Sequence, residues 1–160
     1  MHYEHLIQIN DANNPTLIPL SRRQLWLGLL RRAERPQEFL IGVERVEIME
    51  RSAGYFERDM QLGKLQVCDH ITLEEDVSVH FETQPGENHD GGSLLMRIEE
   101  PQPGDLFVRF VYQTSLPETG PMDTEAGDAY FASYVKAAYR DTDIDSIRKI
   151  RALAETGELG

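Results

Sequence analysis

Apolar and polar residues alternate along most of the chain between residues 43 and 114, which is typical of β-strands with one dry and one wet face. Stretches rich in Gly, Pro, Asp and Asn interrupt the alternation, and these residues favour turns. The pattern therefore predicts an antiparallel meander of six strands, at residues 43–50, 55–62, 65–73, 77–83, 94–99 and 106–114.

Shorter patterns precede this region. Residues 3–9 alternate in the same way and predict a first strand. Ser21 and Gln24 have the spacing of a capping box, which predicts the start of a helix. Pro36 should end this helix and open a second short one over residues 37–40.

A helical pattern begins near Thr124 and carries two apolar stripes. The stripes consist of Phe131, Tyr134, Val135 and Ala138, and of Ile144, Ile147, Ile150 and Ala154. They are rotated from each other by roughly 150° at about 100° per residue, so a straight helix cannot turn both toward one surface. The pattern predicts a kink or break near residues 141–143, with Thr142 or Asp143 capping the second half.

With 160 residues, 40% of them hydrophobic, the chain is long enough for one domain over residues 1–160. A sheet and a helix that each have one apolar face must bury them against each other. We therefore expect an α+β fold in which the sheet curls around the last helix. A curled sheet that grips a helix tends to enclose a cavity, which favours binding of a small molecule.

Charge and cysteine content limit the environment and the partners. Sixteen basic and 28 acidic residues give a net charge of −12, which disfavours nucleic acid and anionic membrane surfaces as partners. Cys68 is the single cysteine, so an internal disulfide is excluded, and the N-terminus has no signal-peptide core. We expect a cytoplasmic protein.

One pair of charges falls on the predicted inner face of the sheet. A two-residue hairpin loop at residues 63–64 places Arg58 directly opposite Asp69. A buried charge is tolerable when it is paired and hydrogen-bonded, so an ion pair that fixes the strand register is the favoured interpretation. The alternative is a polar anchor, in which Arg58 receives a ligand carboxylate or carbonyl and Asp69 holds the guanidinium. Asp69 as a general base has no further support.

A set of inward-facing residues is predicted to line the cavity. It consists of Arg58, Met60, Asp69, Phe81, Met96, Phe110, Tyr112, Phe131 and Tyr134. Ordinary core packing is the alternative for each apolar member. Tyr112 and Tyr134 need hydrogen-bond partners when buried, so they mark either structural bonds or polar points that face a ligand.

The opposite face of the sheet offers a weaker pattern. A turn at residues 74–76 would pair His70 with His80 and Cys68 with Glu82, residue types that ligate metals. An ordinary polar outer face is the preferred interpretation, and no metal site is predicted.

Residues 141–145 have the acidic pattern of the start of a calcium loop, but Ser146 and Ala152 replace its required Gly and Glu, so helix capping is favoured. Motifs for nucleotide binding, a nucleophile elbow and a zinc protease are absent, and no cofactor is predicted.

Four stretches of sequence carry a resemblance to a known family. They are INDANNPTLIPLSRRQLWLGLLRRAERPQEFL, RDMQLGKLQVCDHITL, RIEEPQPGDLFVRFVYQT and AAYRDTDIDSIRKIRAL. The chain resembles the AtaL-like branch of the START / birch-pollen-allergen (SRPBCC) superfamily. The resemblance implies a helix-grip fold: a seven-stranded antiparallel sheet around a long C-terminal helix, with two short helices after the first strand. The glycine-rich loop of the plant allergens is missing, and RSAG occupies that turn.

The resemblance also implies a choice of functions, because members of this superfamily mostly bind hydrophobic small molecules and some are polyketide cyclases or aromatases. Our first hypothesis is a binding module for a small hydrophobic molecule, with Arg58 and Asp69 as its polar anchor. The second is a cyclase or aromatase that uses the same cavity. The third is an interaction protein whose cavity is filled by side chains. The resemblance supplies no catalytic residue, and a homodimer stays open.

Overall fold

The computed structural model describes residues 1–87, 90–116 and 125–159, with no account of the side chains at 125–130. The strands are β1 (His2–Gln8), β2 (Val43–Ser52), β3 (Tyr55–Leu62), β4 (Leu65–Glu74), β5 (Ser78–Thr83), β6 (Gly92–Glu99) and β7 (Phe107–Thr114). The helices are α1 (Arg22–Glu34), the short 3-10 helix η1 (Pro36–Glu38) and α2 (Glu125–Glu155).

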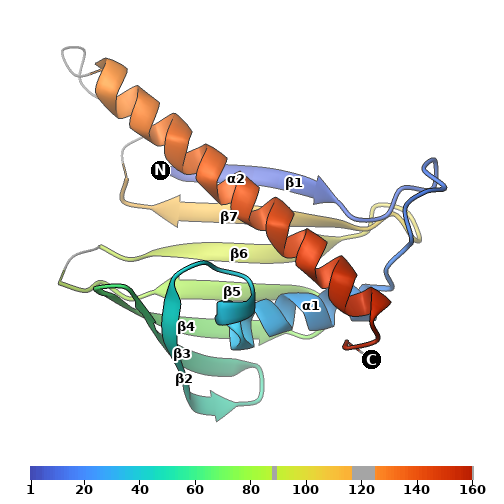
Figure 1. The fold of residues 1–160 in the computed structure, drawn as a ribbon, viewed down its shortest axis with the longest axis horizontal. Helices are drawn as coiled ribbons and strands as arrows, with labels where there is room; N and C mark the ends of the chain where they lie inside the picture. The colour runs from blue at the N-terminus through green and yellow to red at the C-terminus, as the bar shows by residue number, and fades with distance from the viewer. Residues whose placement is uncertain (88–89, 117–124, 160) are drawn as a thin grey trace.

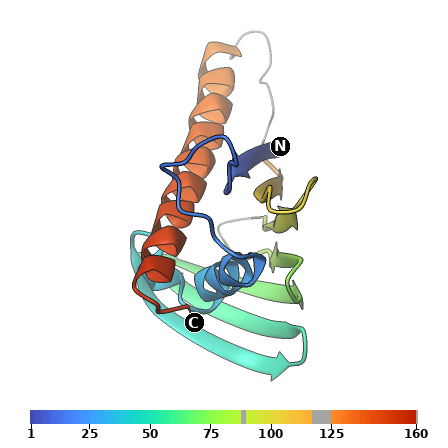
Figure 2. The same cartoon turned by 90° about the vertical axis from the view of Figure 1, so that its right-hand side faces the viewer.

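The seven strands form one antiparallel sheet in the order β1-β7-β6-β5-β4-β3-β2. Figure 1 shows α2 crossing the sheet diagonally, with α1 beside it over the β4 and β5 side. Figure 2 shows the sheet curving from β1 to β2 around the two helices. The predicted α+β helix-grip fold is confirmed. No helix in the described part of the chain is long and apolar enough to cross a membrane.

Helix α1 begins as the sequence predicts. The Ser21 side chain accepts from the Gln24 amide, and the Gln24 side chain accepts from the Ser21 amide, so the capping box is confirmed. The second short helix is only loosely matched, because it is a three-residue 3-10 turn, Pro36–Glu38, and not a helix over 37–40. Arg35 adopts a non-helical conformation that separates this turn from α1.

Helix α2 is continuous from Glu125 to Glu155, so the predicted break near residues 141–143 is wrong. The reason is that the first apolar stripe does not have to face the sheet: Phe131 is 47% exposed and Tyr134 is 63% exposed. This part of α2 extends beyond the edge of the sheet (Figure 1). Asp143 is fully buried and hydrogen-bonds to other elements, so it is not a helix cap.

Strand register agrees with the sequence at one hairpin and differs at the next. In β3 and β4, Arg58 lies opposite Asp69, as predicted. In β4 and β5, His70 lies opposite Glu82, so the predicted pairing of His70 with His80 is wrong. The loop begins one residue later than expected and contains Asp76 in the left-handed conformation (φ 61°), which is typical of a three-residue hairpin loop. The pairing shifts by two residues and keeps the same face outward.

Gly28 allows α1 to approach α2 very closely. A β-carbon at this position would lie 2.4 Å from Cγ2 of Ile150, which is fully buried. No ordinary side chain fits at that distance, so the glycine sets the spacing of the two helices. One turn further along α1, this packing brings Arg32 over the concave face of the sheet, where it is buried.

Candidate functional site

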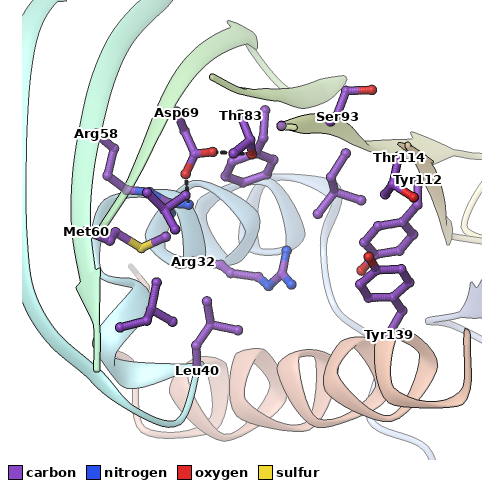
Figure 3. A pocket seen from close by; sticks show the side chains of 16 residues that line it. Arg32, Leu40, Arg58, Met60, Asp69, Thr83, Ser93, Tyr112, Thr114 and Tyr139 are labelled. Carbon is purple, nitrogen blue, oxygen red and sulfur yellow. Dashed lines mark hydrogen bonds and ion pairs between the residues drawn. The ribbon is translucent and has the colours of Figure 1, made fainter. Parts of the chain in front are cut away.

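A cavity of about 410 Å³ lies between the concave face of the sheet and the helices. This is within the range of roughly 300–1,000 Å³ that is typical of small-molecule sites. Its apolar wall consists of Leu40, Met60, Leu62, Val67, Phe81 and Leu94. Figure 3 shows Arg58 and Asp69 at one end, Tyr112 and Tyr139 at the other, and Arg32 between them.

The first end of the cavity holds a buried ion pair. Arg58 donates from Nη2 to Oδ2 of Asp69 at 2.7 Å, and the two residues are only 5% and 2% exposed. Thr83 donates to the other oxygen, Oδ1, at 2.5 Å. Arg58 also donates from Nη1 to the carbonyl of Ala33 in the last turn of α1, at 2.9 Å. The pair thus joins three strands to α1.

Arg58 keeps unused hydrogen-bonding capacity. Among the described residues, its Nε has no partner although the atom is buried. The guanidinium lies 5.2 Å from the ring centroid of Phe81, which gives it a favourable cation–π contact. Burial lowers the pKa of Arg58, and the nearby charge of Arg32 acts in the same direction, while Asp69 opposes both. A group that is expensive to bury and only partly satisfied is a frequent feature of functional sites.

The second end of the cavity is organised by Asp143 of α2, which is fully buried. The Tyr112 hydroxyl donates to both carboxylate oxygens, at 2.7 and 2.9 Å. His5 of β1 donates from Nε2 to Oδ2 at 2.7 Å. Arg32 donates from Nη2 to Oδ1 at 3.3 Å. The carboxylate therefore ties α2 to two strands and to α1, and both of its oxygens are occupied.

Arg32 has weaker partners than Arg58. Besides its 3.3 Å contact with Asp143, it donates from Nε to the Ser146 hydroxyl and from Nη1 to the sulfur of Met96, both at 3.1 Å. A thioether sulfur is a poor acceptor. The guanidinium nevertheless lies in the middle of the cavity (Figure 3).

Two stacked tyrosines form the aromatic wall. The rings of Tyr112 and Tyr139 lie 4.1 Å apart between centroids with an interplanar angle of 4°. Burial is the main cause that raises the pKa of Tyr112 strongly, and the charge of Asp143 adds to it. The pKa of Tyr139 is also raised by burial. Among the described residues, the Tyr139 hydroxyl has no protein partner, so it can bond to a ligand.

The raised pKa of Tyr112 predicts a late step in an alkaline titration. The unfolded chain ionises this phenol near pH 10, whereas the folded protein resists, so stability is present below about pH 10 and falls as the pH rises further. Titration followed by tyrosinate absorbance should show a component that appears only as the protein unfolds. Tyr112→Phe should reduce this component, to which Tyr139 also contributes, and Tyr134→Phe, on the exposed part of α2, should leave it unchanged. Loss of the component in Tyr134→Phe alone would contradict the assignment.

The cavity collects some of the predicted site residues and leaves others out. Arg58, Met60, Asp69, Phe81 and Tyr112 line it. The other four predicted residues do not: Met96 and Phe110 are fully buried in the core, and Phe131 and Tyr134 lie on the exposed part of α2.

For Phe131 and Tyr134 the expectation of an inward position is wrong, because α2 runs past the edge of the sheet where they occur. Sequence reasoning missed Arg32, Tyr139 and Asp143. One signal for a buried Arg32 exists in the sequence: it lies four residues after Gly28 and therefore on the same face of the helix. Two adjacent arginines in the last turn of a helix nevertheless favour the interpretation of a solvent-exposed end.

The described residues offer no metal site. Within residues 1–87, 90–116 and 125–159, no three His, Cys, Asp or Glu side chains gather closely enough to hold an ion. His70, on the outer face, lies 3.0 Å from a carboxylate oxygen of Glu57.

Comparison with known proteins identifies the relatives of the chain. The model of a family described as "Acetylaranotin biosynthesis cluster protein L" (AtaL) matches residues 7–157. No curated protein matches the chain.

Solved structures show the same fold at low identity. The di-domain ARO/CYC StfQ from the steffimycin biosynthetic pathway is 12% identical with a TM-score of 0.66, over 98% of this chain and 52% of that one. The Zhui aromatase/cyclase from Streptomyces sp. R1128 is 14% identical with a TM-score of 0.60, over 97% and 93%. Human STARD10 is 10% identical with a TM-score of 0.61, over 98% and 66%. The chain thus spans about half the length of the di-domain protein.

Proposed function

Because this chain belongs to the AtaL family, a branch of the helix-grip superfamily, we propose that it binds a small, largely apolar molecule in the cavity under α2. Arg58, held by Asp69, serves as the polar anchor of the ligand. The main observation in support is the cavity itself: about 410 Å³, with apolar or aromatic side chains at half of its lining residues and a smaller set of polar and charged ones. Such a volume weighs against an interaction protein whose interior is filled by side chains.

Neutral 2-naphthol is a direct probe of this function. At a concentration of about 100 times its dissociation constant, a ligand that binds only the folded state stabilises it by about 2.7 kcal/mol. For a chain of this size, the melting temperature should rise by roughly 5–10 °C. Calorimetric titration and thermal unfolding measure the two effects. Native mass spectrometry of freshly purified protein should also reveal an apolar passenger.

Filling the cavity should abolish this binding. Leu94→Trp places an indole in the space and should remove the melting shift caused by 2-naphthol. Leu6→Trp is the matched control, because Leu6 is 44% exposed on β1 and does not line the cavity. Circular dichroism establishes that both variants fold. If Leu94→Trp binds 2-naphthol as well as the original protein does, the ligand lies elsewhere and the proposal fails.

A second candidate is a cyclase or aromatase reaction in the same cavity. This activity is favoured by a chain of hydrogen bonds in which Asp143 accepts from both Tyr112 and His5. The chain connects Tyr112, in the cavity wall, to a carboxylate and an imidazole, which are groups that act as general acids and bases. Aldol ring closure needs removal of a proton from carbon and stabilisation of an enolate, for which Arg32 and Arg58 supply positive charge. Ring-closed product formed from poly-β-ketone substrates, and reduced in Tyr112→Phe, would support this activity. If the substrates bind but no product forms, and if Asp69→Asn binds them as well as the original protein does, the cyclase activity is excluded.

A further inference from the structure

The cavity wall is positively charged although the whole chain carries a net charge of −12. Among the described residues that line the cavity, the ionic side chains are Arg32, Arg58 and Asp69. Two guanidinium groups thus face one carboxylate. Asp143 forms an ion pair with Arg32 at 3.3 Å, but it is fully buried and does not line the space. The groups that a ligand would meet thus include more cations than anions, against the sign of the molecule as a whole.

The hydrogen-bonding groups show the same imbalance. An arginine side chain has five N–H donors. Arg32 uses three of them, and Arg58 uses two, with partners among the described residues. Both side chains therefore keep N–H groups without a partner among the described residues, and one of them is the buried Nε of Arg58.

The carboxylate acceptors, in contrast, are more nearly satisfied. One oxygen of Asp69 accepts from Arg58 and the other from Thr83. Both oxygens of Asp143 accept from Tyr112, and each also accepts from a second side chain. Asp69, the carboxylate that lines the cavity, can still accept about one further bond at each oxygen, whereas the two arginines together keep a larger number of unused N–H donors. A ligand that offers acceptors is therefore favoured over one that offers donors.

We propose that the ligand is a monocarboxylate, whose anionic head lies between Arg32 and Arg58 and whose apolar body lies against Leu40, Met60 and Leu94. This inference rests on the proposed binding function and adds the charge and the head group of the ligand. A single carboxylate matches the excess of one cation among the lining residues, and its two oxygens accept from both guanidinium forks. A ketone or an amide would offer the two guanidinium groups a neutral acceptor only, and a phosphate dianion would carry more charge than the excess among the lining residues.

The inference identifies a second anchor. In the proposed function Arg58 alone holds the polar end of the ligand, and it is already bound to Asp69 at 2.7 Å. Arg32 makes three bonds, but they are longer, at 3.3 Å to Asp143 and 3.1 Å to the Ser146 hydroxyl and to the sulfur of Met96. Its bond to a carboxylate is thus weaker than that of Arg58, so Arg32 is the arginine that can turn toward a ligand carboxylate. Arg32 is a specificity-determining residue in this proposal, because it distinguishes an acid from a neutral molecule of the same shape.

A matched pair of probes tests the charge directly. Naphthalene-2-carboxylate and naphthalene-2-carboxamide have the same ring system and nearly the same size, and only the first is anionic at neutral pH. Calorimetric titration should give the carboxylate a dissociation constant about tenfold lower or better, since charge-assisted hydrogen bonds are roughly twice as strong as neutral ones. Equal affinities for the two probes would overturn the carboxylate proposal and leave the binding function intact. Binding of neither probe, together with no binding of 2-naphthol, would overturn both.

Variants of two arginines locate the head group. Arg32→Gln should weaken binding of the carboxylate more than binding of the carboxamide, bringing the ratio of the two dissociation constants close to one. Arg45→Gln is the matched control: it also removes one positive charge, but Arg45 is exposed on β2 and does not line the cavity, so the ratio should persist. An unchanged ratio in Arg32→Gln would overturn the role of Arg32.

A crystal structure of the original protein with naphthalene-2-carboxylate provides a test that needs no variant. The carboxylate should lie within about 3.2 Å of the Arg32 guanidinium. A carboxylate that points to solvent would contradict the proposal, whether or not Arg32→Gln folds.

Discussion

Asp143→Ala is expected to lower the free energy of unfolding by about 3–5 kcal/mol, the usual cost of removing one partner from a buried charged cluster. The reason is the set of donors that the carboxylate satisfies. Arg32 would keep only a hydroxyl and a thioether as partners, and Tyr112 and His5 would each lose a short bond of 2.7 Å. Since small domains have a total stability of roughly 5–15 kcal/mol, the change consumes a large part of it. Urea denaturation measures the difference.

Asp145→Ala is the control for this prediction. Asp145 lies two residues further along α2, is exposed and, within the part of the chain that the structure describes, pairs with Arg148 on the same helix. Removing an exposed pair of this kind should change stability by less than about 1 kcal/mol. Equal effects of the two substitutions would show that Asp143 does not hold the helix, the strands and α1 together as the structure indicates.

The second large effect is expected at the other end of the cavity. Asp69→Ala leaves Arg58 buried without its carboxylate, and a loss of about 3–5 kcal/mol should follow. The double variant Arg58→Met with Asp69→Leu removes both charges and should recover most of that loss, because well-packed apolar residues often replace a buried ion pair at little cost. Denaturant unfolding of the two variants gives the comparison.

The same double variant separates stability from function. It should fold and show a smaller preference for naphthalene-2-carboxylate over its carboxamide, since Arg58 is one of the two proposed anchors and Arg32 remains. A double variant that is no more stable than Asp69→Ala would indicate that the pair is needed for folding through its hydrogen bonds to Ala33 and Thr83. An unchanged preference in a folded double variant would place the carboxylate away from Arg58.

Features fixed by neighbouring residues could be predicted from the sequence. The β3–β4 hairpin has a two-residue loop, so the pairing of Arg58 with Asp69 follows from the loop length and the alternation alone. The capping box needs only Ser21 and Gln24. The predicted pairing of β4 with β5 is wrong because the loop between them begins one residue later than the sequence indicates. The left-handed conformation of Asp76, which sets the length of this loop, cannot be inferred from the neighbouring residues.

Features fixed by distant contacts were missed. Arg31 and Arg32 are neighbours in a helix whose sequence gives no reason to bury either, and only the close approach of α1 to α2 buries Arg32. The acidic stretch at residues 141–145 predicts a helix cap. In the structure, Asp143 instead accepts hydrogen bonds from residues of β1 and β7 that lie more than 30 positions away in the sequence. The apolar stripe that includes Phe131 also does not show that α2 extends past the edge of the sheet at this residue, where it is exposed.

The space beside Gly28 suggests a route for altering ligand choice from outside the cavity. A single added methyl group there would meet Ile150 and push the two helices apart, carrying Arg32 with them while every side chain that borders the ligand stays chemically the same. Engineers who want a related scaffold to accept a bulkier or a neutral guest would therefore begin at this glycine, where one substitution repositions a whole helix.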